Sequence, residues 1–328
     1  MVRVGFIGFG RFAQTRRECL SEVPDASVVG FYDPAFSEGA QQVGLTNFSS
    51  AESLIESVDA IIISVPPRIA PQYVVLGLAN RKHVFCEKPA AVNIQALSQI
   101  SSHLDPALVL AYGFNHRQHA SVSRMRKVIQ EGELGDILWM RGRYGKEVQS
   151  NYRDNWRCDY GLNGGGILID QGIHMIDLMS YLAGGFSGAQ AVLSNRYLGI
   201  DKVEDNAFIT LYSEKNRIAA SVHSTITQWR YLFSLEVFCV RGSLVLNGLR
   251  TKSGSYGDEV LAIKPNHLAD TAQEAIETRY ESNTSWKTEI EAFVQAIVSG
   301  SAYPFATYSD AQETTALIDL IYADAKWI

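Results

Sequence analysis

The chain has 328 residues, of which 46% are hydrophobic and 20% charged, and a formal net charge of −6. This length exceeds one ordinary hydrophobic core, so we expect two domains, residues 1–120 and 121–328. The negative charge argues against a nucleic-acid partner, and no apolar run approaches the roughly 20 residues needed to cross a bilayer. Four widely spaced cysteines indicate neither a zinc site nor a disulfide framework. The composition therefore predicts a cytoplasmic globular protein with no membrane partner and no metal.

Short apolar runs alternate with helical patterns in the first 120 residues. We expect strands at residues 2–7, 27–32, 59–65, 83–86 and 107–112. Helical patterns lie between them, at 11–21, 71–80 and 93–103. Short buried strands separated by helices predict an α/β domain, with a doubly wound parallel sheet of the Rossmann type.

Consecutive strand patterns dominate the rest of the chain. A helix is expected at 122–131, ending at Gly132, and a glycine-rich loop at 149–166 leads into a helix that ends at Gly184. Strands are expected at 137–148, 189–198, 207–213, 217–228, 232–240 and 243–246. Strands joined by short turns predict an α+β domain with a large open, mostly antiparallel sheet of about six strands.

Two amphipathic helices close the chain. The first carries an apolar stripe from Ile290 to Ile297 and ends at Gly300. The second begins with a capping box at 309–312 and carries a stripe from Leu317 to Ile321. We interpret both as packing elements, and the last helix is a candidate to pack back towards the first domain.

The run Gly8-Phe9-Gly10-Arg11-Phe12-Ala13 follows the first strand and opens a helix. Gly8 permits a tight turn, Gly10 lets a pyrophosphate approach the backbone, and Ala13 keeps the helix close to the sheet. A G-x-G-x-x-A match alone is weak, because a glycine turn without a ligand would also fit it. Its place between a strand and a helix near the N-terminus predicts a dinucleotide site.

Asp33 stands at the end of the second expected strand. A carboxylate there can accept hydrogen bonds from the adenosine ribose hydroxyls and would repel a 2′-phosphate. Pro34 and Ala35 follow, without an arginine or serine cluster that could hold such a phosphate. The sequence therefore favours NAD over NADP as cofactor; the alternative is a plain turn aspartate before a proline.

Further candidate cofactor residues lie at or just beyond the carboxyl ends of later strands, where open parallel sheets bind their ligands. They are Ser64, Pro66, Glu87, Lys88 and Asn115. Lys88 could also hydrogen-bond a substrate hydroxyl and stabilise negative charge as the proton leaves. Taken alone, a solvated surface lysine is the simpler interpretation.

Asp170 and His174 share one face if the run at 164–178 opens a helix. A carboxylate beside an imidazole can orient the ring, fix its tautomer and make it a better base. The glycines in front allow another backbone, or a ligand, to come close. Alone, the pair could be a surface hydrogen bond; with the glycine loop and Lys88 we interpret it as catalytic. Asp177 is more simply structural.

The loop at 151–157 mixes aromatic and charged residues. Aromatic faces stack on ligand rings and arginines hold hydroxyls or phosphates, so Tyr152, Arg153 and Trp156 have side chains suited to a ligand. The alternative is a loop that only anchors the structure. Asn115 is a second candidate for contact with the substrate, and Arg117 is interpreted as a salt-bridge residue.

These motifs together resemble the Gfo/Idh/MocA family of sugar and inositol oxidoreductases. The resemblance is carried by Gly8–Ala13, Glu87-Lys88-Pro89, Asn115-His116-Arg117 and the block at 164–178, in the family's order along essentially the whole chain. It implies a Rossmann domain followed by a domain built on a large open sheet. Gln171 is a local departure, because many members carry a smaller or apolar residue there.

The resemblance also implies a catalytic group of Lys88, Asp170 and His174. The lysine and histidine would contact the hydroxyl that is oxidised, with the histidine as proton acceptor and the aspartate positioning it. The expected substrate residues are Lys88, Asn115, Tyr152, Arg153, Trp156, Asp170 and His174. The open sheet of the second domain is expected to pack against another subunit, giving a homodimer or homotetramer.

The sequence therefore predicts an NAD-dependent oxidoreductase that transfers a hydride between a ring hydroxyl and nicotinamide. The expected substrate is a sugar, sugar phosphate, nucleotide sugar or cyclitol. One alternative is a glycoside-cleaving enzyme on the same fold that uses NAD transiently. Others are a regulator that binds NAD without turnover, and an enzyme that keeps its cofactor and passes hydride between two sugars.

Overall fold

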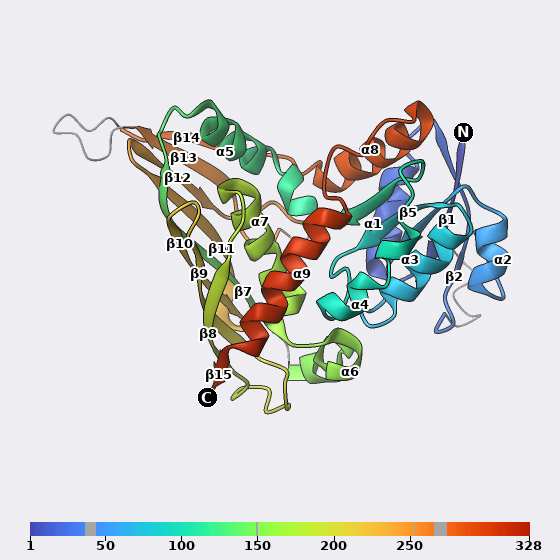
Figure 1. Cartoon of the computed structure of the whole chain (residues 1–328), viewed down its shortest axis with the longest axis horizontal. Coiled ribbons are helices and arrows are strands. Elements are labelled where there is room, and N and C mark those ends of the chain that lie inside the picture. The colour runs from blue at the N-terminus through green and yellow to red at the C-terminus, as the bar shows by residue number, and fades with distance from the viewer. Residues whose placement is uncertain (37–43, 149, 253, 266–273) are drawn as a thin grey trace. The chain divides into compact units, whose positions relative to one another are not determined.

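A computed structural model describes residues 1–36, 44–148, 150–252, 254–265 and 274–328 (Figure 1). Contacts within the chain divide it into two compact units: Met1–Asn115 with Ser285–Thr315, and His116–Thr284 with Ala316–Ile328. Each unit is built around one β-sheet. Within the described ranges, no helix combines the length and the apolar character that crossing a membrane requires.

The sheet of the first unit has six strands in the order β3-β2-β1-β4-β5-β6, and all neighbours are parallel. The strands are β1 (Val2–Ile7), β2 (Ala26–Tyr32), β3 (Thr46–Asn47), β4 (Ala60–Ile63), β5 (His83–Glu87) and β6 (Leu110–Gly113). The predicted Rossmann-type sheet is confirmed. The strand order reverses between β1 and β4, and ligands of open α/β sheets bind at such a switch point.

The helices of the first unit include one that is distant in sequence. They are α1 (Arg11–Leu20), α2 (Ala51–Glu56), α3 (Ala70–Ala79), α4 (Ile94–Ser98), η2 (Ser101–His103) and α8 (Ser285–Ser299). Ile290, Phe293 and Val294 of α8 are buried in the same cluster as Val4 and Phe6 of β1. The expected apolar stripe is confirmed, and it completes the core of the Rossmann sheet.

The last helix, α9 (Tyr308–Ala323), begins earlier than its sequence pattern indicated. The Asp310 carboxylate accepts hydrogen bonds from the Thr307 backbone N–H at 2.8 Å and from its hydroxyl at 2.9 Å. The capping box expected at 309–312 is therefore wrong by two residues. Thr307 and Asp310 have the same three-residue spacing and satisfy the helix start instead.

The sheet of the second unit has nine strands in the order β14-β13-β12-β11-β7-β10-β9-β8-β15 (Figure 1). The strands are β7 (Ile137–Glu147), β8 (Gly188–Ser194), β9 (Asn206–Ser213), β10 (Ile218–Thr225), β11 (Thr227–Cys239), β12 (Gly242–Asn247), β13 (Glu259–Pro265), β14 (Ile276–Tyr280) and β15 (Ala325–Trp327). The β7–β10 and β8–β15 pairs are parallel and the other pairs antiparallel. The mostly antiparallel sheet is confirmed.

The expected count of about six strands in this sheet is wrong. The outer strand β14 has almost fully exposed side chains, and β15 has only three residues, so neither gives a clear apolar pattern. The strand β13 was not predicted either. The strand expected at 217–228 contains β10 and the first residues of β11, whose other residues match the strand expected at 232–240.

The helices of the second unit include short turns in the stretch expected to be a loop at 149–166. They are η3 (Asn115–Gln118), α5 (Ala120–Glu131), η4 (Ser150–Asp154), η5 (Trp156–Cys158), α6 (Tyr160–Asn163), η6 (Leu168–Gly172) and α7 (Ile173–Ala183). Gly132 and Gly184 end α5 and α7 in the left-handed conformation, as their sequence positions predicted.

Candidate functional site

The glycine loop of the first unit joins β1 to α1. Gly8 has φ +80°, and a Cβ there would lie 2.5 Å from the Ser64 carbonyl oxygen, so only glycine fits. A Cβ on Gly10 would meet nothing within 4 Å, so the space beside this backbone is open. Gly10 is the N-cap residue of α1 and has no side chain that could cap the first N–H groups of the helix. Open space at an uncapped helix N-terminus fits the pyrophosphate of a dinucleotide.

Two polar side chains flank this loop. The Asp33 carboxylate accepts hydrogen bonds from the N–H groups of Phe9 at 2.8 Å and Ala35 at 2.9 Å, which fix it beside the loop. The Ser64 hydroxyl, which follows β4, is buried and has no hydrogen-bond partner among the described residues. A buried polar atom without a partner calls for an explanation, and a bound ligand supplies one. Both groups therefore fit a dinucleotide at the switch point.

The other loop candidates differ in exposure. Phe9 is buried and stacks on Phe31 with ring centroids 4.2 Å apart, and Ala13 is also buried. Arg11 and Phe12 are exposed, and Phe12 stacks on Trp286. The side chains of Phe9 and Ala13 therefore pack the core, and the Phe9 N–H is already bound to Asp33.

Lys88 follows β5, and its peptide bond to Pro89 is cis. It is half-buried, as is Pro66 beyond β4. The Glu87 carboxylate beside it is buried and lies 2.7 Å from the Arg16 Nε, so the residue before Lys88 is anchored to α1. Asn115 is buried and donates from its Nδ2 to the Ser285 hydroxyl at 3.0 Å.

In the second unit, Asp170 lies in the π-helical turn η6, and His174 lies in the first turn of α7. The expected helix through both residues is confirmed, but its π-helical start was not predicted. Such turns are rare and are frequent at functional sites.

The Asp170 carboxylate lies between two cations. Its Oδ2 accepts from the Lys146 Nζ at 3.0 Å and its Oδ1 from the Arg157 Nε at 3.0 Å. Burial alone would lower the pKa of Lys146, but Asp170 and Tyr152 hold it above its ordinary value. Sequence reasoning missed both cations, because Lys146 ends β7 and Arg157 lies in η5, and no spacing rule links them to Asp170.

The His174 ring is buried and stacks on the ring of His116, with centroids 3.8 Å apart and planes 13° apart. The His116 Nε2 lies 2.9 Å from the Tyr144 hydroxyl, and burial raises the pKa of that hydroxyl. Two imidazoles this close oppose each other's protonation. The arrangement therefore favours at most one positive charge on the two rings.

Asp177, one turn further along α7, binds the guanidinium of Arg117. The Arg117 Nη2 lies 2.6 Å from its Oδ1, and both side chains are buried. The structural interpretation of Asp177 and Arg117 therefore agrees with their contacts.

Glu204 holds the start of the helix that carries Asp170. Its carboxylate accepts from the N–H groups of Gly166 at 2.9 Å and Leu168 at 2.8 Å, and from the Tyr322 hydroxyl at 3.0 Å. A Cβ on Gly166 would lie 2.0 Å from the Glu204 carbonyl oxygen. Sequence reasoning missed Glu204. The glycine run did predict that a backbone or a ligand comes close, and at Gly166 it is the backbone of Glu204 that does so.

A hollow of about 460 Å³ lies beside the end of β7. Its lining includes Lys146, Glu147, Asn151, Tyr152, Asp154 and Tyr231. Of the predicted substrate residues, Tyr152 lines this hollow, and the Lys146 Nζ lies 4.7 Å from its ring centroid.

Arg153 and Trp156 are not among the described lining residues of the hollow. Arg153 is exposed, and the Arg157 guanidinium covers the Trp156 ring at 4.4 Å. In the described parts of the chain, no three or more acidic, histidine or cysteine side chains are grouped to hold a metal ion.

Two family models match the chain. The model of an oxidoreductase family with an NAD-binding Rossmann fold matches residues 2–111, and that of the GFO/IDH/MocA C-terminal domain matches residues 122–245. The chain therefore belongs to the GFO/IDH/MocA family of oxidoreductases, which confirms the resemblance found in the sequence.

The chain is similar to several sugar and inositol dehydrogenases. It is 30% identical to glucose-6-phosphate 3-dehydrogenase of Bacillus subtilis over 188 residues. These residues make up 56% of this chain and 54% of that protein. It is 25% identical to inositol 2-dehydrogenase of Rhizobium meliloti, over 92% of this chain and 90% of that protein. The structure of levoglucosan dehydrogenase in complex with NADH has the same fold, with a TM-score of 0.86 and 21% identity over 99% of this chain and 98% of that one.

Proposed function

We propose that the protein is an NAD-dependent dehydrogenase that oxidises a ring hydroxyl of a sugar, sugar phosphate, nucleotide sugar or cyclitol. The observation that carries this proposal is the open space at Gly10, beside an uncapped helix N-terminus at the β1–β4 switch point. Bound NAD supplies the hydride acceptor, and the chain's own residues bind the substrate and move its proton. The relatives' dehydrogenase activities support the reaction type.

His174 accepts the hydroxyl proton in this proposal. Its buried position in the first turn of α7, four residues after Asp170, supports that role, because a carboxylate near an imidazole favours proton transfer to the ring. Asp170 positions His174 in this proposal. Its carboxylate is held in place by Lys146 and Arg157, four residues before His174. Lys88 donates a hydrogen bond to the substrate oxygen and stabilises its developing negative charge.

NAD, rather than NADP, is the proposed cofactor because of Asp33. Its two oxygens each accept one backbone N–H and keep a second lone pair for a ribose hydroxyl. A 2′-phosphate at this place would face the carboxylate charge. The test is kcat/KM with each cofactor: NAD is expected to be clearly better, and Asp33→Ser to narrow the difference. A wild-type preference for NADP would overturn this assignment.

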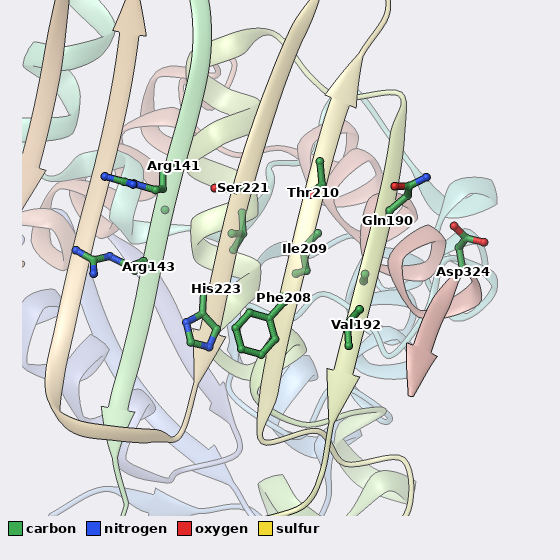
Figure 2. A pocket seen from close by; sticks show the side chains of 13 residues that line it. Arg141, Arg143, Gln190, Val192, Phe208, Ile209, Thr210, Ser221, His223 and Asp324 are labelled. Carbon is green, nitrogen blue, oxygen red and sulfur yellow. The ribbon is translucent and has the colours of Figure 1, made fainter. Parts of the chain in front are cut away.

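A homodimer or homotetramer through the outer face of the nine-stranded sheet is also proposed. Side chains of this face line a hollow of about 660 Å³. Figure 2 shows Phe208 beside His223 among them. Their rings stack with centroids 4.1 Å apart, and Trp139 and Tyr212 are also exposed on these strands. Apolar side chains gathered on one surface support a second copy as partner. Sedimentation should show a dimer or tetramer that Phe208→Asp weakens; a wild-type monomer at micromolar concentration would contradict it.

The experiment that tests the proposed activity is a screen of sugars and cyclitols for net reduction of NAD. Net reduction by a free ring polyol is expected. Cleavage of a glycosidic bond without net reduction would favour the glycoside-cleaving alternative. NAD binding without any turnover would favour a regulator, and purification with tightly bound cofactor would favour hydride transfer between two sugars.

A further inference from the structure

We propose that the hollow beside β7 takes an unphosphorylated ring, and that Glu147 and Asp154 exclude phosphate esters from it. The inference rests on the proposed function and narrows its substrate to a neutral sugar or cyclitol. The hollow adjoins Asp170, because Lys146 in its lining binds that carboxylate at 3.0 Å.

The lining has the groups that recognise a polyhydroxylated ring. Asn151 and Asn155 offer carboxamides that both donate and accept hydrogen bonds, and the Asn155 side chain is held in place by the Arg157 N–H at 3.0 Å. Tyr152 and Tyr231 add aromatic side chains to the lining. A volume of about 460 Å³ lies within the usual range for a small-molecule site.

The charges of the lining are unfavourable for a phosphate. Of the described residues that line the hollow, Lys146 alone carries a positive charge, and its ammonium binds the Asp170 carboxylate. Arg157, the neighbouring cation, donates from its Nε to the other oxygen of the same carboxylate. Glu147 and Asp154 add two exposed carboxylates to the lining.

A phosphate ester would therefore meet two like charges and a lysine that already binds a carboxylate. Phosphate sites are normally built from arginine, lysine and backbone N–H groups. Carboxylates accept hydrogen bonds from ring hydroxyls without any such conflict. Glu147 and Asp154 thus attract the neutral ring and repel the phosphorylated one, which is how sites discriminate between related ligands.

Two matched pairs of compounds test this inference: glucose with glucose 6-phosphate, and myo-inositol with its monophosphate. For each compound we would measure kcat/KM for NAD reduction and, by calorimetry, Kd for the protein saturated with NADH. We expect the neutral member of each pair to be favoured about tenfold or more at low salt, and the ratio to shrink as ionic strength rises. Tighter binding or faster oxidation of a phosphorylated member would overturn the inference.

A charge-neutralising variant assigns the effect to the two carboxylates. Glu147→Gln combined with Asp154→Asn should improve the phosphorylated member several-fold relative to the neutral one. Glu214→Gln is the matched control, because this exposed carboxylate follows β9 and does not line the hollow. If the double variant kept the wild-type ratio between the neutral and the phosphorylated compound, the inference would be overturned. Neutral rings that bind better but are not oxidised would support the inference and count against the proposed dehydrogenase activity.

Discussion

The two units contain charged centres of opposite design. In the first, the Arg16 guanidinium lies between the carboxylates of Glu87 and Glu289, each at 2.7 Å. In the second, the Asp170 carboxylate lies between Lys146 and Arg157, each at 3.0 Å. The three side chains around Arg16 are 0–8% exposed, whereas those around Asp170 are 13–20% exposed.

This difference in exposure separates a structural centre from the proposed functional one. Phe85 and Trp286 cover the Arg16 guanidinium at 4.4 and 4.3 Å, so its charges act only on one another and tie α1 to β5 and α8. Lys146, by contrast, also lines a hollow, so the charges at Asp170 can act on a ligand. Removal of a charge should therefore lower the stability of the fold at the first centre and lower turnover at the second.

Arg16→Met should have the largest effect on stability. It leaves two buried carboxylates without their cation, which costs about 3–5 kcal/mol of unfolding free energy. The control is Arg3→Met, because Arg3 pairs with Asp59 in the same unit but is 54% exposed, and exposed pairs contribute little to stability. Urea unfolding measures both. Equal losses would remove the distinction between buried and exposed pairs.

Asp170→Asn should lower turnover about a hundredfold, the low end of what acid–base groups contribute. Its unfolding free energy should fall by less than that of Arg16→Met, because Lys146 and Arg157 are partly exposed and can be hydrated. Steady-state kinetics and urea unfolding give the two quantities. A large loss of stability with unchanged turnover would make Asp170 a structural residue like Arg16.

The same variant should lower the pKa of Lys146. Burial lowers that pKa and Asp170 raises it. Without the carboxylate charge, the lowering effect of burial is less well balanced, so the pKa falls. Lys146 should then be acetylated at a lower pH than in the wild type, which mass spectrometry can follow. The exposed Lys127 on α5 is the internal reference. An unchanged pH profile for Lys146 would mean that Asp170 does not control its charge.

Glu204 is a third buried or partly buried charged group, and its carboxylate is held by N–H and O–H donors. Its titration should change stability less than the replacements above. Burial raises its pKa to about 7, although the Gly166 and Leu168 N–H groups favour the charged form. Between its ordinary value of 4.5 and about 7, the folded state keeps a proton that the unfolded state has lost. Stability should therefore fall as pH rises through this window.

Melting temperatures of Glu204→Gln between pH 4.5 and 8 check this dependence. The variant should lose the part of the slope that the titration of Glu204 produces. Glu214→Gln, which changes an exposed carboxylate of the same unit, should keep the wild-type slope. Identical slopes in all three proteins would show that Glu204 is not the group responsible.

Features set by local sequence could be predicted, and features set by distant contacts could not. The strand Val2–Ile7 and the glycine loop after it follow from a short apolar run and a required left-handed glycine. The partners of Asp170 lie 24 and 13 residues away, on a strand end and a short helical turn, and depend on how those elements pack. The π-helical turn at Leu168–Gly172 has no sequence signature of its own.

The same limit applies to the packing of α8. Its stripe showed that Phe293 would be buried, but only the folded chain shows that it joins the core of the Rossmann sheet. The candidate residues themselves were found because glycine, aspartate and histidine stand in a recognisable order. Their contacts, such as the stacking of His174 on His116, were not accessible from that order.

The most direct test of the central proposal is His174→Ala, compared with the wild type for turnover and for NAD affinity. We predict that turnover on a ring polyol falls about a hundredfold or more, because the proton acceptor is lost, while the Kd for NAD is unchanged. Unchanged turnover would contradict the proposal that His174 accepts the substrate proton.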